Sequence, residues 1–316
     1  MRITVLAGGV GAARFLRGLK TAAPDAEITV VGNTGDDITL SGLRVCPDLD
    51  TVMYTLGGGI SEEQGWGRAG ESFTVQGQLA DYGVGPDWFS LGDKDIATHI
   101  VRSAMLADGH PLSAVTAELC RRWQPGVRLL PMSDDRVETH VVIEENGTRR
   151  TIHFQEWWLR LHAEVPAVEI TPAGAAEASP APGVLDAIAA ADVVLFPPSN
   201  PVVSIGPILT VPGIKDAVSR KAVVGVSPII GGAPVRGMAD ACLTAIGVPT
   251  TAAAVAAHFG PGLLGGWLVD EQDKAAVDDP ALAGIEVRAL PLYMRDVHAT
   301  AEIARAALSL AAELRR

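Results

Sequence analysis

Apolar runs and a helical pattern alternate over the first part of the chain. Residues 3–7 form a short apolar run that ends at glycines, and residues 27–32 form a second one. Between them, apolar side chains recur with the i, i+3, i+4, i+7 spacing of an amphipathic helix, at Ala12, Phe15, Leu16 and Leu19. A strand, a helix and a strand in this order predict a β-α-β unit with parallel strands and a right-handed crossover.

The same alternation returns near the C-terminal end. Residues 192–196 and 222–227 are rich in β-branched side chains, and each run leads into a loop that contains proline. A final helix is predicted by the spacing of Ile303, Ala307, Leu310 and Leu314. Both ends of the chain therefore fit one doubly wound parallel sheet.

The middle of the chain has a different pattern. Residues 94–107 have helical spacing, whereas residues 137–145 and 148–154 have the pattern of strands. The two strand runs flank Asn146-Gly147, a pair that favours a type I′ turn. This pattern predicts an inserted unit with helices and an antiparallel hairpin.

The predicted fold class is α/β, a Rossmann-like doubly wound parallel sheet with an inserted α+β subdomain that contains the hairpin. Residues 1–60 and 190–316 would form the nucleotide-binding core, and residues 61–189 would form the insertion that covers the substrate. Within it, residues 165–183 are rich in alanine and proline, and we interpret them as a surface connection back to the core.

Composition restricts the class of protein. The chain has 316 residues, 48% of them hydrophobic, which is enough to bury a core. Its 25 basic and 37 acidic side chains give a formal net charge of −12, so we expect no nucleic-acid partner. Residues 193–214 are apolar but contain five prolines, which excludes a spanning helix there. We expect no membrane association and a cytoplasmic location.

A glycine-rich loop follows the first predicted strand. Gly8, Gly9 and Gly11 leave backbone N–H groups accessible at the start of the next helix, where an anion such as phosphate is favoured. Arg14 stands where a dinucleotide fingerprint needs glycine or alanine, and the loop lacks the Gly-Lys-Ser/Thr of a P-loop. The loop is either a phosphate cradle or a simple tight turn.

Four aspartates lie close together in the sequence, with no lysine between them. They are Asp36, Asp37, Asp48 and Asp50. This density suits a hard cation with oxygen ligands, such as Mg²⁺. The alternative is that Asp48 or Asp50 caps a helix that continues through residues 51–56. We favour contact with metal or substrate, because capping needs only one of the four.

A third polar loop follows the predicted strand at residues 192–196. Its Ser199 and Asn200 offer donors and acceptors to a base or a phosphate, and the neighbouring prolines, Pro201 among them, make the loop rigid. A rigid turn without a ligand is the alternative. Trp88 and Phe89 can stack on a ring or simply belong to the core.

Taken together, the chain resembles the 2-phospho-L-lactate transferase family, whose actinobacterial members are phosphoenolpyruvate transferases. The motifs that carry the resemblance span nearly the whole chain: GGVGAARFLRGL at 8–19, GNTGDD at 32–37, PDLDT at 47–51, GDKD at 92–95, PMSDD at 131–135, HFQEWW at 153–158, PPSNPVVSIGPIL at 197–209 and SPIIGG at 227–232.

The resemblance implies a step in the biosynthesis of coenzyme F-420. A guanosine diphosphate esterified to lactate or enolpyruvate would be the donor, and 7,8-didemethyl-8-hydroxy-5-deazariboflavin the acceptor. The terminal ribityl hydroxyl would attack the phosphorus that carries the three-carbon acid and release GMP, with Mg²⁺ required. The sequence leaves open whether the acid is lactyl or enolpyruvyl. The family also implies a homodimer.

The resemblance assigns roles to the candidate residues. The nucleotide would be bound by Gly8, Gly9, Gly11, Asn33, Ser199, Asn200 and Pro201. Asp48 and Asp50 would be the catalytic residues and leading metal ligands, with Asp36 and Asp37 beside them. Asp50, Trp88 and Phe89 would contact the deazaflavin. Because we expect these aspartates in loops at the sheet edge, without a basic partner, they should contribute little to folding.

Two other functions stay open at this point. One is a regulator that binds a uridine-diphosphate sugar and shares the glycine loop but not the Pro-Asp-Leu-Asp-Thr segment. The other is a nicotinamide dehydrogenase, which Arg14 disfavours.

Overall fold

The centre of the molecule is a seven-stranded sheet in which every neighbouring pair is parallel. This computed structural model describes residues 1–315. The strand order is β14-β13-β10-β9-β1-β2-β5. The strands are β1 (Arg2–Ala7), β2 (Glu27–Gly32), β5 (Arg128–Pro131), β9 (Val193–Phe196), β10 (Val223–Val226), β13 (Gly266–Val269) and β14 (Glu286–Ala289). The parallel sheet confirms the predicted Rossmann-like class.

Successive residues of a strand pack alternately into two hydrophobic cores, one on each face of the sheet. Along β1, Val5 packs among the residues of one core and Leu6 among those of the other, and along β2 Val30 and Val31 divide in the same way. A buried parallel sheet needs this double covering, because both faces of its strands are apolar. Because successive side chains of a strand point to opposite faces, each strand contributes to both cores of the doubly wound sheet.

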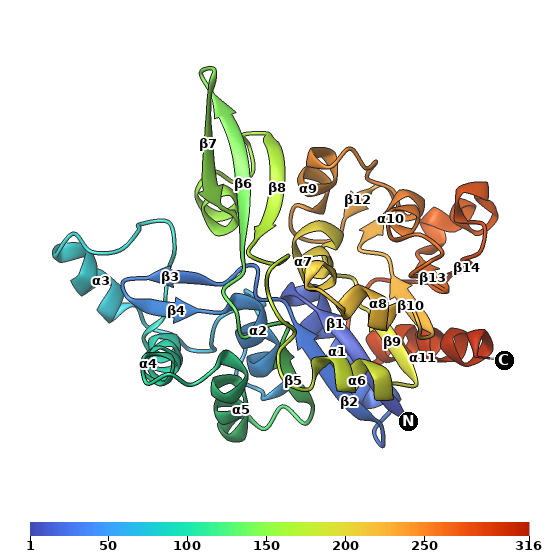
Figure 1. The fold of residues 1–316 in the computed structure, drawn as a ribbon, viewed down its shortest axis with the longest axis horizontal. Helices are drawn as coiled ribbons and strands as arrows, with labels where there is room; N and C mark the ends of the chain where they lie inside the picture. The colour runs from blue at the N-terminus through green and yellow to red at the C-terminus, as the bar shows by residue number, and fades with distance from the viewer. Residues whose placement is uncertain (316) are drawn as a thin grey trace.

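Helices cover both faces of the sheet, as Figure 1 shows. One face packs against α1 (Gly9–Ala22), α2 (Pro47–Leu56), α5 (Leu112–Trp123) and α11 (Val297–Leu314). The other packs against α6 (Val184–Ala190), α7 (Gly206–Thr210), α8 (Ile214–Val218), α9 (Ala239–Ala245) and α10 (Ala252–Phe259).

A second, three-stranded antiparallel sheet projects from this body (Figure 1). Its strands are β6 (Glu138–Glu145), β7 (Thr148–His153) and β8 (Ala167–Ala173), in the order β7-β6-β8. Asn146 and Gly147 join β6 to β7 with φ angles of 52° and 74°. Two positive φ angles are what a type I′ turn requires, so the predicted hairpin is confirmed.

The interpretation of residues 165–183 as a plain surface connection is wrong in part. Residues 167–173 form β8, which pairs with β6. Pro172 is tolerated there because β8 is an edge strand of that sheet. Proline lacks a backbone N–H, and an edge strand has a neighbouring strand on one side only. The division into a core of residues 1–60 and 190–316 and an insertion of residues 61–189 stays a prediction. Within the predicted insertion, however, β5 belongs to the central sheet.

The remaining elements are short or peripheral. They are the hairpin β3 (Ile38–Leu40) and β4 (Leu43–Val45), the pair β11 (Ile229–Ile230) and β12 (Ala233–Pro234), α3 (Thr74–Asp81), α4 (Asp93–Ala107), the π-helices Glu156–Arg160 and Pro201–Ile205, and the 3-10 helices Glu271–Asp278 and Pro280–Leu282. Among residues 1–315, no helix has the length and apolar character needed to cross a membrane.

Candidate functional site

A pocket of about 310 Å³ lies beyond the carboxyl ends of the central strands. Loops that follow β1, β2, β9 and β10 all contribute to its lining, and β1 lies between β2 and β9 in the sheet. Parallel strands direct their following loops to one edge, where open α/β sheets bind ligands. The glycine, aspartate and serine-asparagine loops therefore converge on one pocket.

The glycine loop lines this pocket and is tightly packed from behind. Gly9 has a φ of +74°, in the region that favours glycine. A Cβ built on Gly11 would lie 2.3 Å from the carbonyl oxygen of Pro198, and one on Gly8 would lie 2.6 Å from Cβ of Ser204. The loop needs these glycines for its own packing, in addition to any contact with a phosphate.

Asn33 holds two of the four aspartates together. Its Nδ2 donates to Oδ2 of Asp48 at 2.8 Å, to the carbonyl oxygen of Val203 at 3.1 Å and to Oδ1 of Asp36 at 3.3 Å. Its Oδ1 accepts from the backbone N–H of Gly35 at 2.9 Å. Asn33 is fully buried and lies outside the pocket lining, so in this structure it positions carboxylates.

Asp36 and Asp48 both line the pocket beside the glycine loop. Burial, and next the charge of Asp48, raises the pKa of Asp36 well above its usual value. Burial raises the pKa of Asp48 to about 6, although the hydrogen bonds from Asn33 and Gly9 oppose the shift. The two carboxylates thus share one amide donor and repel each other when both are ionised.

These two carboxylates could hold a magnesium ion. Mg²⁺ in proteins is commonly held by one or two carboxylates together with substrate phosphates and water. Among residues 1–315, no group of three or more His, Cys, Asp or Glu side chains could hold a metal ion. A metal here would therefore rest on Asp36, Asp48 and groups of the substrate.

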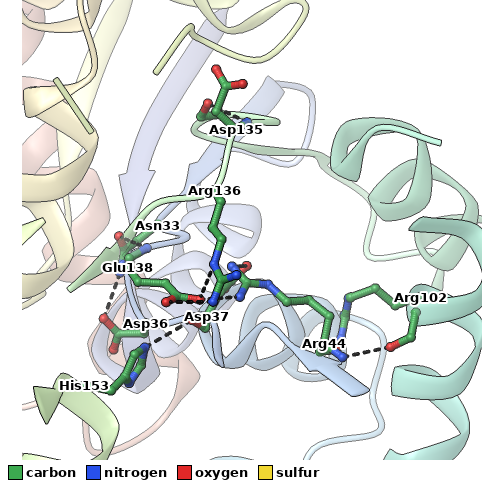
Figure 2. Close-up of polar contacts among 12 residues, drawn as sticks. Asn33, Asp36, Asp37, Arg44, Arg102, Asp135, Arg136, Glu138 and His153 are labelled. Atoms are coloured by element: carbon green, nitrogen blue, oxygen red, sulfur yellow. Dashed lines mark hydrogen bonds and ion pairs between the residues drawn. The ribbon is translucent and has the colours of Figure 1, made fainter. Parts of the chain in front are cut away.

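Asp37 faces a basic cluster on the other side of its loop (Figure 2). Arg44 lies 3.7 Å from Asp37 and 2.6 Å from Glu138, and Arg136 also contacts Glu138, at 3.0 Å. Burial raises the pKa of Asp37 to about 7, although the charge of Arg44 opposes the shift. Asp37 lines a second, separate pocket with Arg44 and Arg136. The expectation that the aspartates have no basic partner is wrong here.

Asp50 is also paired, with Arg102 of α4. Both side chains are buried, the ion pair is close, and His99 lies 3.8 Å from the same carboxylate. Arg102 Nη1 and His99 Nδ1 are 3.0 Å apart. Asp50 is not among the residues that line the 310 Å³ pocket. The expectation that Asp50 is a loop residue is wrong, because it lies in the first turn of α2. Its buried ion pair with Arg102 does not favour the expectation that it contributes little to folding.

Neither Asp48 nor Asp50 caps α2. The helix begins at Pro47 with Cys46 as its N-cap, and no side chain makes a capping hydrogen bond. Oδ1 of Asp48 instead accepts from the backbone N–H of Gly9 at 2.7 Å. The first turn of α2 is thereby joined to the first turn of α1, next to the pocket.

Ser199 and Asn200 line the pocket and also stabilise their own loop. The Ser199 hydroxyl donates to the carbonyl oxygen of Gly8 at 2.8 Å. Oδ1 of Asn200 accepts from the backbone N–H groups of Val202 and Val203, which caps the helix Pro201–Ile205. The binding role and the rigid-turn alternative are thus compatible. Pro201 is buried and lies outside the lining.

The aromatic side chains of the pocket differ from the predicted pair. Trp88 and Phe89 pack on Ile38, Leu40 and Val45 of the β3–β4 hairpin, outside the pocket lining. The pocket is instead lined by Trp66, Phe154, Trp158 and Tyr293. Phe154 and Trp158 belong to the HFQEWW segment, which the sequence had already marked, whereas nothing in the local pattern of Trp66 or Tyr293 separates them from core aromatics.

Three arginines of the pocket lining were not singled out by the sequence as a group. Arg14, Arg236 and Arg295 line the pocket and are exposed. In the part of the chain that the structure describes, none of them forms an ion pair within 4.0 Å, whereas Arg17 and Arg136 do. The pocket is therefore lined both by buried carboxylates and by exposed arginines that form no ion pair within the described residues.

Comparison with known proteins places this arrangement in a family. The family model of 2-phospho-L-lactate transferase CofD matches residues 3–290, which include all the loops of the pocket. The chain belongs to this transferase family.

Curated relatives within the transferase family match over their full length. A phosphoenolpyruvate transferase of Streptomyces griseus is 68% identical over 317 residues, covering 100% of this chain and 100% of that protein. One of Thermobifida fusca is 68% identical over 323 residues, covering 100% of this chain and 99% of that protein. The resemblance seen in the sequence motifs is confirmed.

A solved structure supports the fold alone. A protein of the UPF0052 family from Bacillus halodurans aligns with a TM-score of 0.61 and 20% identity, over 97% of this chain and 99% of that one. Membership of the transferase family removes the two alternatives, a sugar-nucleotide regulator and a dehydrogenase, as family assignments.

Proposed function

We propose that this protein transfers a phosphoenolpyruvyl or 2-phospho-L-lactyl group from a guanosine-diphosphate-linked donor to 7,8-didemethyl-8-hydroxy-5-deazariboflavin, in the biosynthesis of coenzyme F-420. The family membership supports the type of transferase, and the motif resemblance supports the donor and acceptor. The observation that carries the proposal is one pocket in which the glycine loop, two buried carboxylates and three unpaired arginines meet.

The donor diphosphate fits at the start of α1. Backbone N–H groups of the glycine loop and the positive end of the helix dipole favour anions there. The N–H of Gly9 is already bound to Asp48, so the free N–H groups of the following residues are the available donors. Ser199 and Asn200, which line the same pocket from another loop, would contact the nucleoside.

Asp36 and Asp48 would hold Mg²⁺ in this reaction. When bound, the ion supplies charge neutralisation and Lewis-acid polarisation of the diphosphate oxygens. Asn33 keeps both carboxylates in place through its Nδ2 donor. Asp50 as a catalytic residue and metal ligand, and Asp37 as a metal ligand, stay predictions, and the pairing of each with an arginine does not support them.

The chemistry is a displacement at phosphorus. The terminal ribityl oxygen forms a bond to the phosphorus that carries the three-carbon acid, and the bond from that phosphorus to the bridging oxygen breaks, so that GMP leaves with the bridging oxygen. The hydroxyl proton passes to a buried carboxylate of the pocket.

The deazaflavin ring requires an apolar or aromatic surface. Trp158 and Phe154 line the pocket, and their ring centroids are 5.9 Å apart. We therefore place the ring against this pair. Contact with Trp88 and Phe89 stays a prediction that their distance from the pocket lining does not favour. Homodimer formation and a cytoplasmic location also stay predictions.

Mass spectrometry of the reaction product tests the proposal. Purified protein is incubated with the deazaflavin, Mg²⁺ and either the lactyl or the enolpyruvyl ester of guanosine diphosphate. A deazaflavin phosphodiester and an equal amount of GMP are expected with at least one donor. Absence of product with both donors, combined with tight calorimetric binding of UDP-N-acetylglucosamine, would overturn the proposed transfer reaction.

A further inference from the structure

Arg236 lines the pocket from the segment after β12 and is held there by two contacts. Its Nη2 donates to the carbonyl oxygen of Gln64, and its guanidinium carbon lies 5.0 Å from the ring centroid of Trp66. A cation over the face of an indole is attracted by the ring. These contacts orient the guanidinium and leave its other N–H donors available to the pocket.

The guanidinium of Arg236 also stands close to the glycine loop. Both Arg236 and Val10 of the glycine loop lie next to Gly65: a Cβ built on Gly65 would be 2.9 Å from Nη1 of Arg236 and 3.0 Å from Cγ1 of Val10. Partial burial, and next the positive charge of Arg14, lowers the pKa of Arg236.

Two like charges, those of Arg14 and Arg236, therefore face the same space, and among residues 1–315 neither has a carboxylate within 4.0 Å. The hydrogen bond from Arg17, and to a smaller extent the charge of Arg14, lowers the pKa of Glu62, which is paired with Arg17. An anion bound between Arg14 and Arg236 would remove this repulsion.

The proposed donor has two kinds of anionic group, its diphosphate and the carboxylate of its three-carbon acid. Its diphosphate is matched by the loop and by a metal on Asp36 and Asp48, which leaves the carboxylate of the three-carbon acid. A guanidinium binds a carboxylate through two parallel N–H···O bonds, a geometry that a phosphate-binding backbone loop does not offer.

We propose that Arg14 and Arg236 bind the carboxylate of the donor's three-carbon acid and thereby select acid-bearing donors. This inference rests on the proposed function. It assigns Trp66 and Gln64 a positioning part, because they hold Arg236 in the orientation that the carboxylate needs.

Calorimetric binding of two matched esters tests the inference without any turnover. The lactyl ester of guanosine diphosphate and its isopropyl ester differ only in that a methyl group replaces the carboxylate. Wild-type protein should bind the lactyl ester about tenfold or more tightly than the isopropyl ester, as expected for a charge-assisted contact. Arg236→Gln and Arg14→Gln should each reduce this ratio towards one, with the affinity for the isopropyl ester changed less than about twofold.

Controls separate this inference from folding and from the proposed function. Arg121→Gln removes an exposed arginine that pairs with Glu118 and lies outside the pocket lining, so it should keep the wild-type ratio. Arg236→Lys should restore part of the ratio, because the charge returns without the planar fork. Equal binding of both esters by wild-type protein, or an unchanged ratio in both Gln variants, would overturn the inference. Failure of wild-type protein to bind either ester would instead count against the proposed function.

Discussion

Asp48 accepts a hydrogen bond of 2.7 Å from the backbone N–H of Gly9, so the first acidic residue of α2 is tied to the glycine loop at the start of α1. The other oxygen of Asp48 accepts from Asn33. With both oxygens engaged, the carboxylate has one orientation beside the pocket. The loop proposed to bind phosphate and the carboxylate proposed to hold metal are thus parts of one hydrogen-bonded unit.

Replacing Asn33 should destabilise this unit. Asn33→Ala removes the three contacts of Nδ2 and the acceptor for the N–H of Gly35, all in a fully buried place. Loss of a buried donor that serves two carboxylates should lower the free energy of unfolding by about 1–3 kcal/mol. Urea unfolding measures the change. A midpoint equal to that of wild-type protein would contradict the role of Asn33 as an organising residue.

Gly11→Val should weaken nucleotide binding and also reduce stability. The sequence suggests that bulk at this position meets the phosphate, but the Cβ would first meet the carbonyl oxygen of Pro198, at 2.3 Å. Displacement of that backbone should cost about 1–3 kcal/mol. Thermal unfolding and GDP calorimetry measure both effects.

Gly77→Ala is the matched control for this glycine variant, because a Cβ at that position in α3 has nothing within 4 Å. It should leave GDP affinity unchanged and should not lower the melting temperature, since alanine favours a helix over glycine. Equal losses in the Gly11 and Gly77 variants would mean that the close contact with Pro198 is unimportant.

Asp50→Asn should lower the free energy of unfolding more than Asp48→Asn does. It leaves Arg102 buried without a carboxylate, and breaking a buried pair from one side typically costs about 3–5 kcal/mol. Guanidinium unfolding of the Asp50 and Asp48 variants compares the two positions. A smaller loss of stability in Asp50→Asn than in Asp48→Asn would show that the pair with Arg102 does not hold α2 to α4.

Asp48→Asn should weaken Mg²⁺ binding in the presence of GDP and reduce turnover on the order of a hundredfold, as for the loss of one electrostatic catalytic group. Calorimetry of Mg²⁺ and the rate of phosphodiester formation are the two measurements. The exposed Asp87, changed to Asn, is the control and should alter neither. If Asp48→Asn bound Mg²⁺ as tightly as wild-type protein, the metal would have to be held elsewhere.

Patterns of short range were sufficient to predict much of this protein. The continuous apolar runs of the strands and the helical spacing at Ala12 to Leu19 predicted a parallel α/β sheet, since strands buried on both faces are apolar throughout and the helical period determines which face of a helix is buried. Asn146-Gly147 predicted a turn because few residues accept two positive φ angles. The order of the loop motifs indicated the transferase family. Each of these inferences depends on residues that are neighbours in the chain.

Tertiary structure decided how the four aspartates divide. Asp36 and Asp48 line the pocket, while Asp37 and Asp50 turn to Arg44 and Arg102. Arg102 is 52 residues from Asp50, and no spacing rule connects them. The same holds for Arg236 and Trp66, which meet in the pocket lining. Which charge is neutralised inside the protein, and which is left for a ligand, depends on distances that only the packing of the helices on the sheet sets.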